Sequence, residues 1–252
     1  MSTRIRRHDN GIVVLTMDNP PVNALPAHGW QELAESLRQA GADERTRVVV
    51  LQAEGRGFNA GVDIKELTAD PGHSKLVAVN HGCYEAFKSV YECPVPVISA
   101  VHGFCLGGGI GLVGNSDIII ASADATFGLP EVDRGALGAA THLQRLVPQH
   151  YARAMFYTGR TATAHDLARF GSVWEVVEPE RLHDAALELA GSIADKEPLV
   201  VRRAKEALNG IDPVDVNRSY RFEQGFTFEL NLSGVSDRAR EAFVDGERPA
   251  DG

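Results

Sequence analysis

The sequence predicts an α/β protein with an all-helical C-terminal part. Short runs of β-branched residues alternate with amphipathic segments up to about Pro179. Beyond that point helix-like segments follow one another, and no further strand candidate occurs. Alternation of strands and helices is typical of layered proteins with a mostly parallel, buried sheet.

Five segments are predicted to be strands, because they are short, rich in β-branched residues and bounded by turn residues. They are Ile12–Leu15, Val48–Leu51, Val95–Ile98, Ile118–Ile120 and Val173–Val177. Their continuous apolar character indicates burial on both faces of a sheet.

Two helices are predicted between these strands. The first runs from about Pro26 to Ala40, with proline near its first position and Gly41 just past its end. The second runs from about His73 to Tyr91 and carries an apolar face.

Four helices are predicted in the tail: Leu182–Ala194, Pro198–Leu208, Val214–Leu230 and Ser236–Phe243. Their apolar residues, among them Phe222, Phe226 and Leu232, exceed what one helical layer can bury alone. We expect the tail to dock on the core or on another subunit.

Composition excludes several classes of function. The chain has 252 residues and a formal net charge of −9, which disfavours binding to nucleic acid or to anionic membrane surfaces. No apolar run reaches the roughly 18 residues of a membrane span. Three cysteines without a C-x-x-C pair predict a reduced, cytoplasmic protein, and no cluster has the spacing of metal ligands.

Two glycine-rich segments, residues 55–63 and 103–114, each follow a predicted strand. The second contains a G-x-G-x-x-G pattern at Gly109, Gly111 and Gly114, as dinucleotide-binding proteins do. That fingerprint must open a helix long enough to cross back over the sheet. Because the strand at Ile118 begins about four residues after Gly114, no such helix fits, and no nicotinamide or flavin site is predicted.

The same glycines suit a site made of backbone N–H groups, since glycine lets the main chain approach a ligand closely. If Gly108 or Gly109 opens a short helix, its free N–H groups and the helix dipole would face a ligand. An N–H group near Val62 could converge on the same point and complete an oxyanion hole. Tight packing of strand against helix is the alternative explanation, and spacing alone does not decide.

Three motifs, in their order and distances, resemble the crotonase (enoyl-CoA hydratase/isomerase) superfamily. They are Ala60–Leu67, Gly103–Gly109 and Phe127–Glu131. Further matches are Pro21–Leu25, Ala242–Phe243 and Arg248–Pro249. The resemblance therefore spans essentially the whole chain.

This resemblance implies a spiral of ββα units in residues 1–195 and a helical trimerisation region in residues 196–252. It implies a homotrimer or a dimer of trimers, an acyl-CoA substrate and no separate cofactor. By position, the N–H groups of Val62 and Gly108 would hold the thioester oxygen. The residues expected along the CoA are Val22, Ala24, Ala60, Val62, Asp63, Ile64 and Gly108.

One departure from the hydratase pattern bears directly on the reaction. In the hydratases two glutamates hold the nucleophilic water, and the positions that match them are Gly111 and Glu131. Glycine can neither transfer a proton nor hold water with a side chain. Hydratases usually carry a second glycine directly after the one that matches Gly138, whereas this chain has Ala139 there. Ala139 is expected to narrow the space in which that water sits. Ordinary hydration is therefore not the expected reaction.

The segments Gly57–Asp63 and Gly107–Asp117 look closest to an actinobacterial branch that is similar to ring-opening CoA-thioester hydrolases of steroid catabolism. This resemblance implies hydrolytic C–C ring opening of a cyclic β-keto acyl-CoA in steroid (cholesterol) ring degradation. An enoyl-CoA hydratase or isomerase of fatty-acid β-oxidation is the alternative. A non-catalytic CoA-binding protein is a third hypothesis, against which the presence of Glu131 argues.

Glu131 is the expected general acid and base, with a pKa raised by an apolar pocket. Asp63 precedes a short helix through Leu67, so it fits a helix N-cap as well as a catalytic role. Asp133 and Arg134 could orient Glu131 or form an ion pair.

Two further residues are expected to be structural. His142 is more typical of a helix face or a subunit contact than of a catalytic base. Cys105, between Phe104 and Leu106, is expected to be buried and inert.

Overall fold

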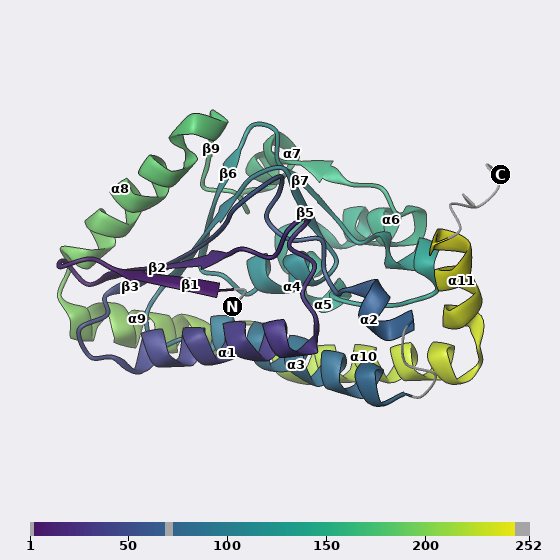
Figure 1. The fold of residues 1–252 in the computed structure, drawn as a ribbon. Helices are drawn as coiled ribbons and strands as arrows, with labels where there is room; N and C mark the ends of the chain where they lie inside the picture. Colours follow the sequence, from purple (N-terminus) through teal and green to yellow (C-terminus); the bar gives the residue numbers. More distant parts are fainter. Residues whose placement is uncertain (1–2, 69–72, 245–252) are drawn as a thin grey trace.

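A six-stranded sheet runs through the centre of the computed structural model, which describes residues 3–68 and 73–244 (Figure 1). The strand order is β1-β2-β3-β4-β6-β9, and only the edge strand β1 is antiparallel to its neighbour. The strands are β1 (Thr3–Arg7), β2 (Ile12–Met17), β3 (Val48–Ala53), β4 (Val97–Val101), β6 (Ile118–Ser122) and β9 (Glu175–Val177). This confirms the α/β class.

Both faces of this sheet are covered, as the unbroken apolar strands require. Val13, Leu15 and Met17 point into a core shared with α1 (Ala27–Ala42) and α3 (Ser74–Tyr91). The alternate residues Ile12 and Val14 point into a second core beneath α8 (Leu182–Ala194). Figure 1 shows α8 on one side of the sheet, with α1 and α3 on the other.

A small second sheet positions the segments that carry Gly108 and Glu131. It consists of β5 (Phe104–Leu106), β7 (Thr126–Gly128) and β8 (Ala162–Thr163). Strands β5 and β7 are parallel neighbours, with Leu106 paired to Gly128. The short helix α4 (Gly108–Val113) follows β5, and the 3-10 helix η1 (Pro130–Arg134) follows β7. Because β5 and β7 are parallel, both helices begin at the same end of these strands.

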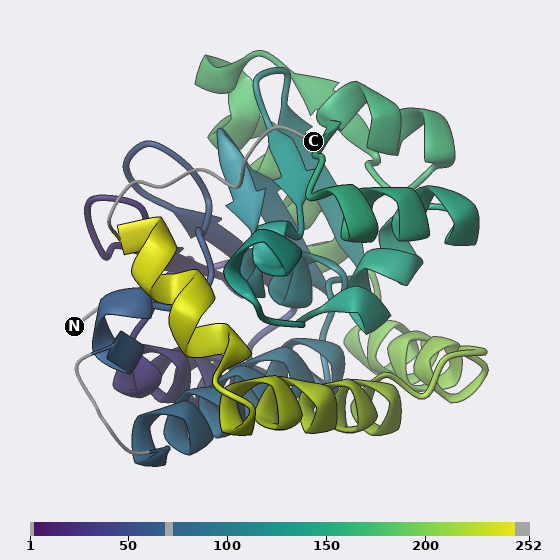
Figure 2. The ribbon, with the colours of Figure 1, turned by 90° about the vertical axis from the view of Figure 1, so that its right-hand side faces the viewer.

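The helices after β9 return to the core. They are α9 (Pro198–Gly210), α10 (Val216–Leu232) and α11 (Val235–Val244). Helix α10 packs on α5 (Ala140–Leu146) and α3, while α11 packs on η1 and on α2 (Ile64–Thr68). Figure 2 shows α10 and α11 in yellow along this side of the core. Of the two docking surfaces expected for the tail, the structure therefore shows the first, the core of the same chain.

Some predicted boundaries were wrong. Strand β4 begins at Val97 rather than Val95, and β9 begins at Glu175 rather than Val173. Helices α5, α6 (Gln149–Thr158) and α7 (Ala164–Phe170) and the second sheet were missed, because each is short and lacks a clear periodic pattern.

Two expectations remain predictions. Nothing tests the division of the chain at residue 195, nor the role of residues 196–252 in assembly. Arg248–Pro249 lies outside the described residues. Within the described part of the chain, no helix is both long and apolar enough to cross a membrane.

Candidate active site

A cavity of about 110 Å³ lies between the loop after β3, α2, α3, the start of α4, η1 and the tail helices α10 and α11. Its lining includes backbone at the start of α4, one carboxylate and several side chains of the tail. The residues discussed below that line it are Ala60, Val62, Ile64, Asn80, Cys83, Phe87, Gly108, Glu131, Arg134, Ala139, Tyr220, Thr227, Asn231 and Arg240. It therefore joins segments from most of the length of the chain.

Two backbone N–H groups at this cavity have no acceptor among the described residues. They belong to Val62 and to Gly108, the first residue of α4. A β-carbon added to Gly61 would lie 3.1 Å from the Gly108 nitrogen, which places the two loops in contact. Such a pair of donors is suited to an oxygen atom that gains negative charge.

Glycine is required at the start of α4 for steric reasons. Gly107 has a φ of +57°, and a β-carbon there would lie 2.5 Å from Oε1 of Glu131. A β-carbon on Gly108 would lie 2.6 Å from the Trp30 ring. The carboxylate and the indole thus pack directly on the main chain that carries the Gly108 donor.

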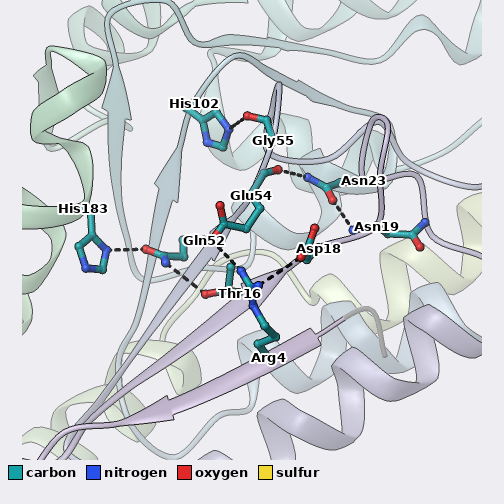
Figure 3. Close-up of polar contacts among 10 residues, drawn as sticks. All are labelled: Arg4, Thr16, Asp18, Asn19, Asn23, Gln52, Glu54, Gly55, His102 and His183. Carbon is teal, nitrogen blue, oxygen red and sulfur yellow. Dashed lines mark hydrogen bonds and ion pairs between the residues drawn. The ribbon is translucent and has the colours of Figure 1, made fainter.

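Side-chain amides hold the loop before Val62. Asn59 accepts a hydrogen bond from the Gly61 nitrogen at 2.8 Å and donates to the Asn23 carbonyl at 2.6 Å. Asn23 in turn donates to the carbonyl oxygens of Gly57 and Glu54. Figure 3 shows Asn23 between Glu54 and Asn19. Sequence reasoning missed both asparagines, although each stands inside a quoted motif.

Glu131 carries the carboxylate of the cavity. The residue as a whole is half-buried, but its Oε2 atom is sealed from solvent and has no partner among the described residues. Burial raises the pKa of this carboxyl to about 8, against the smaller opposing effect of Arg134. Near neutral pH the group can therefore both donate and accept a proton.

An aromatic ring fills the position where a second carboxylate would begin. A β-carbon on Gly111 would lie 2.2 Å from Cζ of Phe87 and 2.3 Å from its Cε2. The ring is fixed by edge contacts with Trp30 and His142 and by a tilted contact with Tyr220. The absent glutamate has thus been replaced by an apolar wall rather than by open space.

Hydrogen bonds from the tail helices hold the segment that follows η1 in place. Glu223 of α10 accepts hydrogen bonds from the backbone nitrogens of Ala140 at 2.7 Å and Thr141 at 3.1 Å. Thr227 donates to the Leu137 carbonyl at 2.8 Å, and Ser236 of α11 donates to the Gly135 carbonyl at 2.5 Å. The position of Glu131 therefore depends on both tail helices.

The other predicted site residues are divided between the cavity and its surroundings. Ala60, Val62, Ile64, Gly108 and Glu131 line the cavity. Val22, Ala24 and Asp63 do not. The Val22 carbonyl accepts from the Ala60 nitrogen at 3.2 Å, and Ala24 is held through its carbonyl by Asn19. Asp63 accepts from the Lys65 nitrogen at 2.9 Å, which is the N-cap arrangement.

The neighbours of Glu131 along the chain differ in placement. Arg134 lines the cavity, and its positive charge acts on the pKa of Glu131. Asp133 instead lies against Gly159, where an added β-carbon would be 2.6 Å from Oδ2. Only Arg134 is therefore placed to act on the carboxylate.

The remaining titratable groups near the cavity are buried. His142 is enclosed by Phe87 and Tyr220, and burial lowers its pKa to about 3, so it is neutral. Burial raises the pKa of the Cys83 and Cys105 thiols, so both stay protonated. Asn80, Tyr220 and Arg240 were not singled out from the sequence, because their distance along the chain from Glu131 gives no spacing signal. No group of three His, Cys, Asp or Glu side chains within the described ranges could hold a metal ion.

Comparison with known proteins places this chain in a family. A family model described as enoyl-CoA hydratase/isomerase matches residues 7–229. A (7aS)-7a-methyl-1,5-dioxo-2,3,5,6,7,7a-hexahydro-1H-indene-carboxyl-CoA hydrolase of Rhodococcus jostii (strain RHA1) is 62% identical over 240 residues, covering 95% of this chain and 93% of the relative. A hydrolase of the same name from Mycobacterium tuberculosis (strain ATCC 25618 / H37Rv) is 63% identical over 234 residues, covering 93% and 95%.

A solved structure agrees with the fold. The crystal structure of an enoyl-CoA hydratase from Mycobacterium smegmatis superimposes with a TM-score of 0.80 at 30% sequence identity and covers 99% of this chain and 98% of that one. The family match spans most of the chain, and the relatives align along nearly their whole length. The chain therefore belongs to the enoyl-CoA hydratase/isomerase, or crotonase, family.

Proposed function

We propose that the protein hydrolyses a carbon–carbon bond in a cyclic β-keto acyl-CoA, opening the ring in steroid ring degradation. The thioester enolate that departs is stabilised by the N–H groups of Val62 and Gly108. Glu131 handles the proton. Coenzyme A enters as part of the substrate, and no separate cofactor takes part.

One observation carries this proposal. The cavity combines two unsatisfied backbone donors with a single carboxylate, and Phe87 closes the position of the second carboxylate. Hydration of a double bond divides its proton transfers between two glutamates in the hydratases that this chain resembles. Ring opening requires one proton to be taken from water and the same proton to be returned to carbon, which one carboxylate can do.

The atoms balance along this route. Ionised Glu131 removes a proton from water as the oxygen adds to the ring ketone. The bond between that carbon and the carbon next to the thioester then breaks, and its electron pair becomes the enolate. Protonated Glu131 returns the proton to that carbon, and the former ketone carbon becomes a carboxylic acid. A pKa of about 8 keeps both forms of Glu131 available near neutral pH.

The relatives support the class of substrate. The two hydrolases that are 62% and 63% identical to this chain act, by their names, on a bicyclic dioxo acyl-CoA. Isomerisation of an enoyl-CoA also requires only one carboxylate and is the alternative. The position of Phe87 argues against hydration, because its ring leaves no room for a second carboxylate at position 111.

The test uses a panel of CoA thioesters in ¹⁸O-labelled water, with products identified by mass spectrometry. A cyclic β-keto acyl-CoA should give a ring-opened product with one labelled oxygen in its new carboxylate. Glu131→Gln is the matched control and should give none. A shifted double bond without label would support isomerisation, and label in a hydroxyl would support hydration; either result would overturn the proposal.

We also propose that residues 196–252 join copies of this chain into a cytoplasmic homotrimer or dimer of trimers. Phe222, Phe226 and Leu232 support this, because they stay 71%, 43% and 73% exposed although α10 packs on the core. Large apolar side chains exposed together are typical of an interface.

A further inference from the structure

The part of the cavity formed by α3, η1 and α11 carries polar side chains among apolar ones. Asn80, Arg134 and Arg240 line it together with Leu76 and Leu137. A hydrocarbon chain could form no hydrogen bonds with these two guanidinium groups and the amide. Among them, the buried Nδ2 atom of Asn80 has no acceptor in the described part of the chain, and leaving such a group unpaired costs free energy, which favours a ligand with an oxygen atom.

Arg240 is the more deeply placed partner of its ion pair. Its side chain is 11% exposed, whereas that of Asp237 is 59% exposed. Nη1 donates to Oδ1 of Asn231 at 2.9 Å, and Nη2 pairs with Asp237. Asn231 is itself held by its bond to the Thr227 carbonyl at 2.7 Å. The guanidinium is thus fixed against the cavity and not free to extend into solvent.

These contacts leave donors of Arg240 unused. A guanidinium has five N–H groups in a planar fork, and the two contacts of Arg240 are the only ones found among the described residues. Asn80 adds a further donor, because its buried Nδ2 atom has no acceptor in the part of the chain that the structure describes. Oxygen atoms of a bound acyl group would satisfy these donors. A hydrocarbon acyl group would leave them unpaired.

We propose that Arg240, with Asn80, binds an oxygen function of the acyl group remote from the thioester, and that this contact selects oxygenated acyl groups over hydrocarbon ones. The oxygen belongs either to a second ketone of the substrate or to the carboxylate that ring opening creates. The proposal rests on the proposed function only in that the acyl group of a CoA thioester occupies this cavity. It does not depend on which bond breaks.

The experiment measures binding of three CoA thioesters by calorimetry. Cyclohexanecarboxyl-CoA has no remote oxygen, 4-oxocyclohexanecarboxyl-CoA has a ketone, and trans-4-carboxycyclohexanecarboxyl-CoA has a carboxylate. None has a ketone β to the thioester, so none can undergo the proposed cleavage, and the wild-type protein can be used. The wild type should bind at least one oxygenated thioester more tightly than the hydrocarbon one.

Arg240→Gln should remove that preference, weakening the oxygenated ligand by about 10- to 100-fold while leaving cyclohexanecarboxyl-CoA unchanged. Arg238→Gln is the matched control, because Arg238 is an exposed arginine of the same helix, and it should behave as the wild type. Asn80→Leu provides a second variant that should reduce the same preference. A preference for the ketone or for the carboxylate identifies which oxygen is bound.

Two outcomes would overturn the proposal. One is equal binding of all three thioesters by the wild type. The other is a loss in Arg240→Gln that is the same for all three, which would mean that Arg240 only supports the fold. Failure of the ring-opening proposal is seen separately, in the absence of a labelled carboxylate product.

Discussion

The ring of Phe87 occupies the space into which a side chain on Gly111 would project, with 2.2 Å between its Cζ and the position of a β-carbon. Phe87 lies on α3 and Gly111 on α4, and the two residues depend on each other for steric reasons. Glycine admits the ring, and the ring prevents a carboxylate from taking up the geometry of a two-glutamate hydratase.

The first prediction follows from this pair. Wild-type hydration of crotonyl-CoA should have a kcat/KM roughly 10²- to 10⁴-fold below that of a two-glutamate hydratase, because one positioned acid–base group is absent. Gly111→Glu alone should not restore it, since the new side chain collides with Phe87 and overpacks the core. Only Gly111→Glu combined with Phe87→Ala should raise the rate.

Loss of the enoyl absorbance measures this rate for the wild type, both single variants and the pair. Hydratase-like kcat/KM in the wild type would contradict the single-carboxylate argument. Full hydration by Gly111→Glu alone would contradict the steric role of Phe87.

The second prediction concerns Glu131. Glu131→Gln keeps the shape of the side chain but exchanges no proton, so turnover should be lost while the thioester still binds. In the wild type, kcat/KM should rise with pH through an apparent pKa of about 8, because the ionised form activates water. Steady-state kinetics across pH, with calorimetry for binding, measure both effects. Unchanged turnover in Glu131→Gln would remove Glu131 from the mechanism.

The same pKa sets a third prediction, on stability. Folding raises the pKa of Glu131 from 4.5 to about 8, so the folded state binds the proton more tightly than the unfolded state. This group therefore contributes stability below its unfolded pKa, and that contribution is lost as pH rises from 4.5 through about 8. In thermal unfolding, the stability of Glu131→Gln relative to that of the wild type should increase as pH rises. The exposed Glu229→Gln is the control, and a constant difference across pH would refute this linkage.

A fourth prediction isolates the N–H group of Gly108. Gly108→Pro removes the donor at the first position of α4, where proline suits the helix. Gly108→Ala keeps the donor but makes the same collision with Trp30, so it is the matched control. The proline variant should lose a further 10²- to 10³-fold, roughly, in kcat relative to the alanine variant. Equal activity of the two folded variants would mean that this N–H group does not contact the reacting oxygen.

The fifth prediction concerns assembly. Phe222→Ser with Phe226→Ser should shift the protein toward smaller species in sedimentation, because these rings are exposed on α10 and meet edge to face, forming one apolar patch. The substituted side chains do not line the cavity, so thioester binding should persist in the dissociated protein. A wild-type chain that sediments as a monomer would end the proposal of a trimer.

Local periodicity explains which parts of the fold could be predicted. The strand at Ile12 and the helix at Leu182 were located because the pattern of apolar residues within each segment marks a buried element. The strand at Phe104 has three residues, and its partner at Thr126 also has three, so neither gives a periodic signal. The motif around Glu131 and a raised pKa for its carboxyl were predicted, but most of the residues that pack around it were not.

The composition of the cavity wall could not be predicted for a different reason. Asn80 and Arg240 line the same cavity only because α10 packs on α3 and α11 packs on η1. Likewise, the absence of a glutamate at position 111 is visible in the sequence, whereas its replacement by the ring of Phe87 is a contact between α3 and α4. Contacts between distant segments leave no trace in spacing.

The bonds from Glu223, Thr227 and Ser236 to the segment after Glu131 impose an order on the making of this protein. A ribosome releases both sheets and the glutamate before it releases the helices that hold the glutamate's segment in place. A nascent or prematurely terminated chain without α10 and α11 therefore lacks all of these bonds. The segment after Glu131 is held in this way only once the residues up to Ser236 have been made.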